Sequence, residues 1–190
     1  AAMTQRYRDL AFTPSVREAQ RLMGTADHFA GMAPAEAKPD ELTEKEAGFI
    51  AARDSFYMAT VSETGWPYIQ HRGGPKGFVR ILSPNRLAIA DFRGNRQYMS
   101  VGNLAADNRV SLFFMDYPNR RRLKVMAYAS TVGRDEDGDL IAKVRDEGYR
   151  AVIERAMVFD VEAFDWNCPQ HITPRFTEDE LVAAFEQAGR

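Results

Sequence analysis

The chain has 190 residues, and its 25 Lys and Arg nearly balance its 27 Asp and Glu, which gives a formal net charge of −2. This balance provides no long-range field for a polyanion, so we expect no nucleic-acid partner. The single cysteine excludes an intrachain disulfide framework, and three histidines leave little material for a metal site. Together with the lack of any apolar run of about 18 residues, these features predict a cytoplasmic protein with neither a metal nor a membrane partner.

Residues 1–42 differ from the rest of the chain in their pattern of apolar, Gly and Pro residues, and we expect them to form a helix and a linker. Thr13 as N-cap and Pro14 at the first helical position predict a helix that ends at Gly24. The stretch that follows, up to Leu42, has scattered Gly and Pro residues without periodicity, which is typical of a surface linker.

Residues 43–176 are expected to form the main domain. The sequence Thr-Glu-Lys-Glu at 43–46 is a capping box and predicts a helix from Glu44 to Arg53. Segments rich in β-branched and aromatic residues follow, separated by turn signals. They predict strands at Ser55–Ser62, Pro67–Arg72, Phe78–Leu82, Arg86–Phe92, Val110–Tyr117, Leu123–Val132 and Ala156–Phe164. Helical segments at Arg96–Ala106 and Leu140–Asp146 interrupt the series.

The predicted fold class is therefore mainly β with flanking helices, a small barrel of about six to seven mostly antiparallel strands. An irregular stretch is expected at Asp165–Phe176. A second capping box at 177–180 predicts a terminal helix through Gln187, and we expect residues 177–190 to pack on the same domain.

The first candidate site is the loop His71–Phe78, which has three glycines and the cations Arg72 and Lys76. Glycines let the backbone approach a ligand, and the two cations favour an anion. The alternative is a wide bulge or barrel corner that needs glycine for its geometry alone.

The second candidate is Asp91–Arg96, where a strand leads through Gly94 and Asn95 into a predicted helix. Free amide groups at a helix start favour an anion, and Arg96 can add a charge-assisted contact to a phosphate. The alternative is an Asn95 cap beside an arginine that is merely on the surface.

The third candidate is the irregular stretch itself, which combines a large flat side chain with several hydrogen-bond donors. This mixture suits a planar heteroaromatic ring. The residues concerned are Trp166, Asn167, Gln170, His171 and Arg175. The alternative is a strap that packs Trp166 and Phe176 onto the barrel, and Cys168 within it is expected to be packed rather than nucleophilic.

With these residues in hand, the sequence resembles the pyridoxamine 5′-phosphate oxidase-like family, in particular its flavin-nucleotide-binding proteins. The resemblance runs from about Glu44 to Arg175. It rests on four segments in this order: FIAARDSFYMATVSETGWPYIQHRGGPKGFVRIL, LAIADFRGNRQYMSVGNLAADNRVSLFF, RRLKV and WNCPQHITPR.

The resemblance implies a split β-barrel homodimer that binds FMN at the subunit interface. Arg72, Lys76, Gly77, Phe78 and Val79 would lie on the strand and loop that meet the flavin. Asn95 and Arg96 would correspond to the phosphate-binding motif, and Arg122 would occupy the position of a glutamine that contacts the flavin.

The chain departs from the oxidases where they have Arg-x-Val-Leu-Leu-Lys and Ser-Arg-Lys, because it has Gly-Phe-Val-Arg-Ile-Leu and Gly-Asn-Arg instead. Their pyridoxal-phosphate pattern is not recognisable near the end of the chain. We therefore expect an FMN-dependent oxidoreductase that acts on a small-molecule substrate other than vitamin B6, with its catalytic residues unassigned. The alternative is a noncatalytic barrel that carries or senses haem or flavin.

Overall fold

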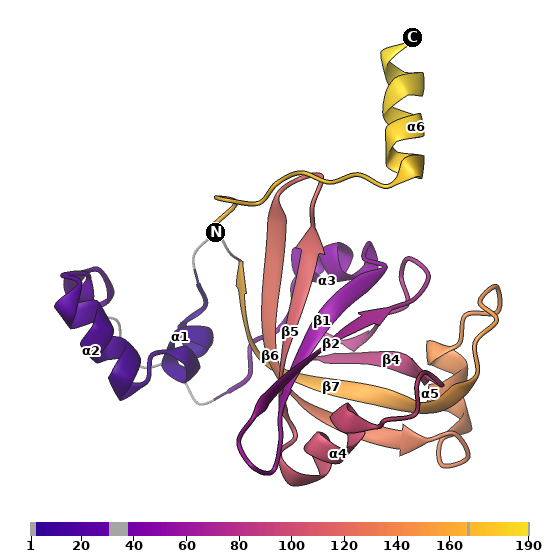
Figure 1. Ribbon diagram of the computed structural model, residues 1–190, viewed down its shortest axis with the longest axis horizontal. Coiled ribbons are helices and arrows are strands. Elements are labelled where there is room, and N and C mark those ends of the chain that lie inside the picture. Colours follow the sequence, from indigo (N-terminus) through magenta and orange to yellow (C-terminus); the bar gives the residue numbers. More distant parts are fainter. Residues whose placement is uncertain (1–2, 31–37, 167, 190) are drawn as a thin grey trace.

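The protein is described by a computed structural model, in which residues 3–30, 38–166 and 168–189 are placed (Figure 1). Seven strands in these residues form a single antiparallel sheet in the order β2-β1-β5-β6-β7-β4-β3. The strands are β1 (Ser55–Val61), β2 (Pro67–Gly73), β3 (Arg80–Ser83), β4 (Arg86–Phe92), β5 (Arg109–Asp116), β6 (Arg121–Gly133) and β7 (Ile153–Trp166). The predicted fold class is confirmed.

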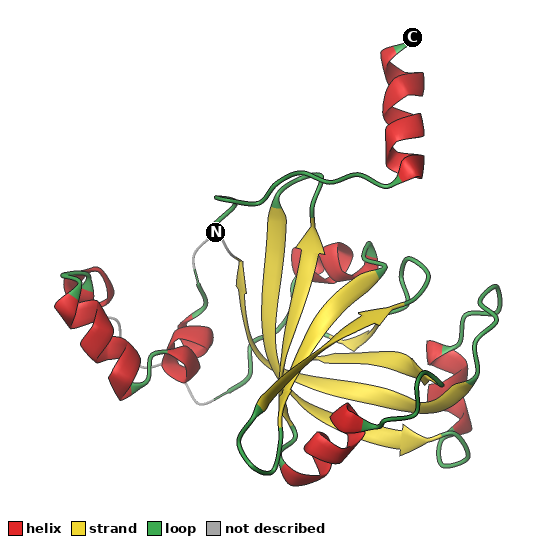
Figure 2. Cartoon of the chain, in the orientation of Figure 1, coloured by secondary structure: helices red, strands yellow, loops and turns green. Residues whose placement is uncertain are grey.

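The sheet curls into a barrel around one aromatic core. The ring centroid of Phe56 on β1 lies 5.0 Å from that of Phe114 on β5 and 6.1 Å from that of Phe159 on β7. β1 and β7 are three positions apart in the sheet, which in a flat sheet would separate them by about 14 Å. The short distance between the Phe56 and Phe159 rings shows that the sheet closes on itself, and Figure 2 shows the strands fanning out around this core.

Three helices cover the barrel. The helix α3 (Glu44–Ala51) begins with the predicted capping box and buries Phe49 and Ile50. The helix α4 (Met99–Ala106) is attached to β1 through the Asn103 amide, which donates to Thr60 Oγ1 at 2.8 Å. The helix α5 (Gly138–Val144) buries Ile141 and Val144 in a second apolar cluster with residues of β4 and β7.

The N-terminal residues contain one helix more than predicted. The helix α1 (Gln5–Ala11) precedes α2 (Pro14–Leu22) and the 3-10 turn η1 (Ala26–Phe29). Its sequence is mostly polar, but Tyr7 is buried and the Arg6 guanidinium pairs with Glu162 on β7. Tertiary contacts therefore hold a helix that the hydrophobic pattern does not reveal.

Two element boundaries differ from the prediction because of nonlocal pairing and backbone conformation. The strand β7 continues to Trp166, since Asp165 and Trp166 pair with Lys124 and Leu123 on β6. The helix α4 begins at Met99 rather than at Arg96, because Arg96 and Tyr98 have φ values of 62° and 54°. A right-handed helix cannot include residues in this left-handed conformation.

The terminal helix α6 (Glu178–Ala188) has the predicted capping box but buries none of its residues, and it stands clear of the sheet in Figure 1. The expected packing of this helix on the domain is therefore not seen within one chain. The domain boundaries at residues 42 and 176 stay predictions. Within the placed residues, no helix has both the length and the apolar character needed to cross a membrane.

Candidate functional site

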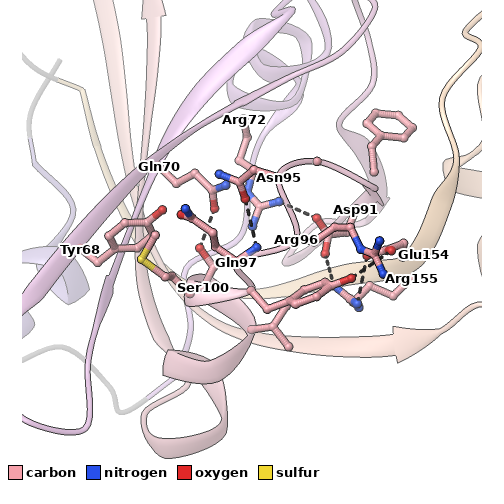
Figure 3. A pocket seen from close by; sticks show the side chains of 15 residues that line it. Tyr68, Gln70, Arg72, Asp91, Asn95, Arg96, Gln97, Ser100, Glu154 and Arg155 are labelled. Atoms are coloured by element: carbon pink, nitrogen blue, oxygen red, sulfur yellow. Dashed lines mark hydrogen bonds and ion pairs between the residues drawn. The ribbon is translucent and has the colours of Figure 1, made fainter.

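A pocket of about 150 Å³ lies between β2, the β4–α4 loop and the start of β7, and we call it the basic pocket (Figure 3). It contains three residues predicted from sequence: Arg72, Asn95 and Arg96. Its other polar lining residues are Tyr68, Gln70, Asp91, Gln97, Tyr98, Ser100, Glu154 and Arg155.

The wall on β2 is formed by side chains at every second position. Tyr68, Gln70 and Arg72 point to the pocket side because successive residues of a strand face opposite ways. Gln70 accepts a hydrogen bond of 2.7 Å from Ser100 Oγ on α4, which ties this wall to the helix. Arg72 donates from Nη1 to Asp91 Oδ1 at 2.6 Å.

Arg72 also has the most unusual atom of the site. Among the described residues, its Nε is the one buried side-chain nitrogen or oxygen without a hydrogen-bond partner. An orphaned buried donor costs about 1–3 kcal/mol, so native proteins usually satisfy it with protein, water or a ligand. Arg72, which lines the basic pocket, therefore carries a buried donor that no described residue uses.

The β4–α4 loop supplies the opposite wall through an uncommon backbone. Arg96 and Tyr98 both have a positive φ, a conformation that costs a residue other than glycine about 1–2 kcal/mol. Asn95 Oδ1 accepts a hydrogen bond of 3.1 Å from the Gln97 backbone and stabilises the turn. Backbone strain of this kind is concentrated at functional sites.

Arg96 is exposed and, within the described residues, its guanidinium takes part in no hydrogen bond or ion pair. The prediction that a helix begins at Arg96 is wrong, because α4 begins at Met99 and Arg96 lines the pocket from the strained loop before it. Its contact with an anion stays a prediction.

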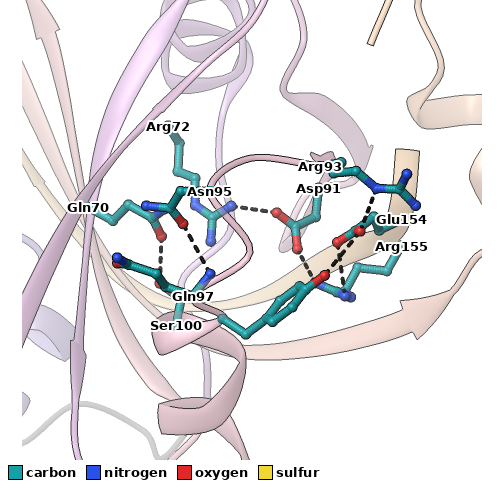
Figure 4. A network of polar contacts seen from close by, with 10 residues as sticks. Gln70, Arg72, Asp91, Arg93, Asn95, Gln97, Ser100, Glu154 and Arg155 are labelled. Carbon is teal, nitrogen blue, oxygen red and sulfur yellow. Dashed lines mark hydrogen bonds and ion pairs between the residues drawn. The ribbon is translucent and has the colours of Figure 1, made fainter. Parts of the chain in front are cut away.

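Behind the pocket lies a network of charges on β4 and β7 (Figure 4). Arg155 Nη1 donates to Asp91 Oδ2 at 2.7 Å, and its guanidinium lies 5.2 Å from the Tyr98 ring centroid. Glu154 Oε1 accepts from Arg93 Nε at 3.0 Å and from the Tyr98 hydroxyl at 3.1 Å. The hydrogen bond from Arg93, more than that from Tyr98, lowers the pKa of Glu154.

The network leaves the basic pocket positively charged. Three arginines line it, Arg72, Arg96 and Arg155. Two carboxylates, Asp91 and Glu154, line it as well, which leaves an excess of one positive charge among the lining side chains. Such a site favours an anion.

A second cavity of about 160 Å³ adjoins the basic pocket and shares Gln70, Arg72 and Phe92 with it. Phe78 and Ile89 line it from the core side. A ligand that extends from the basic pocket along β2 would meet apolar side chains here.

Two other predicted residues, Lys76 and Arg175, lie in a different place. They line a separate pocket of about 730 Å³, between the β2–β3 loop, the end of β5 and the segment before α6. The Arg175 guanidinium lies 5.2 Å from the Tyr117 ring centroid. Burial, with a hydrogen bond to Tyr57 as a smaller cause, raises the pKa of Tyr117. The structure thus separates Lys76 and Arg175 from Arg72.

The remaining predicted residues do not line the basic pocket. Phe78 and Val79 are buried in the core, and Gly77 adopts a φ of 84° in the turn before them. Arg122 is half-buried on β6, opposite Met115.

The predicted ring-binding segment after β7 is also mostly outside the site. Trp166 belongs to β7, packs edge-on against Phe49 at 4.7 Å and donates from Nε1 to Glu46 at 2.6 Å. The alternative prediction of a strap holds for Trp166 only, because Phe176, its other packed residue, is 54% exposed. Gln170 and His171 are exposed, as is Cys168, which was expected to be packed; the chain leaves the barrel after β7. Asn167 lies outside the described residues.

Several residues of the basic pocket were not predicted from the sequence. Tyr68 and Gln70 share the period-two face of Arg72, so strand alternation could have found them. Asp91 and Arg155 are paired across β4 and β7, 64 residues apart in the chain, and no local pattern signals such a pair.

The chain is thus a curled antiparallel β-barrel with a strained, basic loop between β4 and α4. The chain belongs to the pyridoxamine 5′-phosphate oxidase family, whose pattern matches residues 42–165. This match confirms the family resemblance. No curated protein sequence matches the chain.

Solved structures show the same fold at low sequence identity. HupZ from Group A Streptococcus is 15% identical with a TM-score of 0.54, over 71% of this chain and 99% of that one. A conserved hypothetical protein from Mycobacterium tuberculosis, Rv2991, is 14% identical with a TM-score of 0.50, over 75% and 96%. An FMN-binding protein from Syntrophomonas wolfei is 13% identical with a TM-score of 0.49, over 81% and 95%.

Proposed function

We propose that this protein binds FMN, that the basic pocket holds its phosphate, and that the complex is an oxidoreductase acting on a small molecule. Members of the family commonly bind FMN or other flavins. The observation that carries the proposal is the orphaned Nε of Arg72, a buried donor in a pocket with excess positive charge.

The charge of the pocket fits a phosphate monoester. Such a group carries about −1.5 to −2 at pH 7, and the side chains that line the pocket carry an excess of positive charge. Arg72 and Arg96 would hold the phosphate, since arginine forms charge-assisted hydrogen bonds with phosphate oxygens. Asn95 would support the loop from which Arg96 reaches it.

The size of the pocket argues that a second copy of the chain completes the site. Sites that bury drug-sized ligands measure about 300–1,000 Å³, whereas the basic pocket measures about 150 Å³. One chain therefore has room for the phosphate end of FMN and leaves the ring to be covered from outside.

The outer face of the sheet offers a surface for that second copy. The strand register places Ile69, Ala59, Ser111 and Met126 in one row across β2, β1, β5 and β6. Ile69 is 66% exposed, and an apolar groove of about 430 Å³ opens beside Ala59 and Met126. An exposed apolar face of this kind is typical of an interface between subunits, so we propose a homodimer.

Bound FMN would accept and return hydride or electrons at its N5 atom. The contribution of this chain is to hold the phosphate, to present Gln70 and Phe78 along the neighbouring cavity, and to keep the cofactor oriented. The substrate and the residues that contact it stay unassigned, as does the cytoplasmic location expected from composition.

The test compares FMN with riboflavin, which lacks the phosphate. We expect Arg72→Gln to weaken FMN binding about 10- to 100-fold, the range for a lost hydrogen bond to a charged group, and to leave riboflavin binding within about twofold. Arg86→Gln is the matched control, because Arg86 forms an exposed ion pair with Asp160 away from the pocket.

Equal affinities of the wild-type protein for FMN and riboflavin would contradict the proposal. An absorption band of the purified protein near ~400 nm, in place of the flavin band near ~450 nm, would instead indicate haem as the bound group.

A further inference from the structure

We propose that Asp91 is a positioning residue, whose carboxylate fixes Arg72 and Arg155 so that their remaining N–H groups face the bound anion. The inference rests on the proposed phosphate site. It extends that site to a residue that cannot itself donate a hydrogen bond to the phosphate, because an ionised carboxylate only accepts. A carboxylate in an anion site is at first sight misplaced, so its function needs an explanation.

The geometry gives each arginine one oxygen of Asp91. Oδ1 accepts from Arg72 Nη1 at 2.6 Å and Oδ2 accepts from Arg155 Nη1 at 2.7 Å. The Asp91 side chain is 7% exposed, and those of Arg72 and Arg155 are 13% and 19% exposed. Charge-assisted contacts this short in a shielded place are strong and directional.

The contact also joins parts of the barrel that the backbone leaves unpaired. Arg72 is on β2, at one end of the sheet, whereas Asp91 and Arg155 are register partners on β4 and β7. No backbone ladder connects β2 with β4 among the described strands. Asp91 therefore sets the position of Arg72 relative to the loop that carries Arg96.

A guanidinium group has five N–H donors. One donor of Arg72 goes to Asp91, and its Nε stays unpartnered, which makes it the donor that the fixed side chain presents. A free arginine side chain loses rotamer entropy when it is immobilised. With Asp91 in place, most of this loss occurs on folding rather than on binding.

Two effects of Asp91 on an anion have opposite signs, and the structure indicates which is larger. Its negative charge repels a phosphate, while its hydrogen bonds order the arginines that attract one. Both of its oxygens are already engaged by guanidinium groups, so its charge is largely compensated where it stands. Ordering should therefore outweigh repulsion, and loss of the carboxylate should weaken phosphate binding.

The experiment uses Asp91→Asn in the full chain, with FMN, riboflavin and inorganic phosphate as competing probes. We expect FMN and phosphate affinities to fall at least fivefold and riboflavin affinity to change less than twofold. Unchanged or tighter FMN binding by Asp91→Asn would show that charge repulsion dominates and would overturn the inference, as would equal losses for FMN and riboflavin.

Asp160→Asn is the control, because Asp160 forms the Arg86 ion pair at the other end of the same β4–β7 ladder. This substitution should alter neither the FMN nor the phosphate affinity.

Arg155→Lys keeps the net charge and removes the planar guanidinium group, so it reports on positioning alone. We expect at least a threefold loss of FMN affinity; if Asp91→Asn fails to fold, full FMN affinity of Arg155→Lys overturns the inference.

These measurements distinguish failure of the proposed phosphate site from failure of the positioning role of Asp91. If the wild-type protein does not prefer FMN to riboflavin, the phosphate site itself is wrong. If the wild-type protein prefers FMN and Asp91→Asn keeps the same preference, only the positioning role is wrong.

Discussion

Replacing Arg96 should change stability and cofactor binding separately, because this residue combines a cationic side chain with a strained backbone. Its φ of 62° is unfavourable for any side chain beyond glycine. Arg96→Gly and Arg96→Ala both remove the guanidinium, but only the glycine variant also relieves the strain. The difference in the free energy of unfolding between the two variants therefore measures the contribution of the backbone conformation alone.

The magnitude follows from two opposing contributions. The left-handed conformation costs a residue with a Cβ about 1–2 kcal/mol, and glycine loses about 0.4–1 kcal/mol through the greater freedom of the unfolded chain. Arg96→Gly should be more stable than Arg96→Ala by about 0.5–1 kcal/mol, which is about 1–4 °C in melting temperature for a chain of this size. Both variants should bind FMN about 30-fold more weakly, equivalent to about 2 kcal/mol.

Urea and thermal unfolding of the cofactor-free variants test the first part, and FMN titration followed by flavin fluorescence tests the second. Arg120 is the matched control, since it has a φ of 51° at the β5–β6 turn and does not line the basic pocket. Arg120→Gly should show the same advantage over Arg120→Ala with unchanged FMN affinity. Equal stability of the two Arg96 variants would refute the strain argument, and FMN affinity within twofold of wild type would refute the phosphate contact.

Three further predictions follow from the structure. We expect light scattering to show a homodimer, and its melting temperature to rise when FMN is added, since a ligand bound only by the native dimer stabilises it. Ile69→Lys should yield a monomer. A wild-type monomer that binds FMN would contradict this prediction. Removal of residues 177–190 should leave the melting temperature of the isolated chain within about 2 °C, because α6 buries none of its residues; a larger loss would show that α6 packs on the barrel. Burial acts to raise the pKa of Asp116, but hydrogen bonds from Arg121 and Asn119 and the charge of Arg53 outweigh it, so the pKa lies below its ordinary value. Its stabilisation should be complete above about pH 5 and be lost as the pH falls through the lowered value. Asp116→Asn should therefore flatten the dependence of melting temperature on pH between about 5 and 3, and an unchanged slope would count against this role.

The sequence predicted those parts of the fold that depend on local patterns. Both capping boxes lie where their Thr and Glu residues placed them, and all seven strands were found because each has its own run of β-branched and aromatic residues. The boundaries failed where distant pairing decides. The end of β7 was expected to be irregular, yet Asp165 is held by β6 and by the Lys124 ammonium group at 3.0 Å.

The same division between local and nonlocal information explains the site. Arg72, Asn95 and Arg96 could be predicted because glycine-rich loops with cations mark anion sites in the sequence itself. Lys76 has the same local signature as Arg72 and lies four residues away, but β2 ends between them and the chain turns, so the two cations reach different pockets.

The residues that the sequence did not reveal are those that determine how the predicted ones are held. Arg72 is an ordinary strand residue until Asp91, brought beside it by the closing of the barrel, fixes its guanidinium group. Arg96 is an ordinary loop residue until the backbone around it takes a conformation that Asn95 and Tyr98 stabilise through their own hydrogen bonds. A motif in the sequence therefore predicts which side chains could meet an anion, whereas the closing of the barrel, which brings β2 beside β4, determines whether they could meet it together.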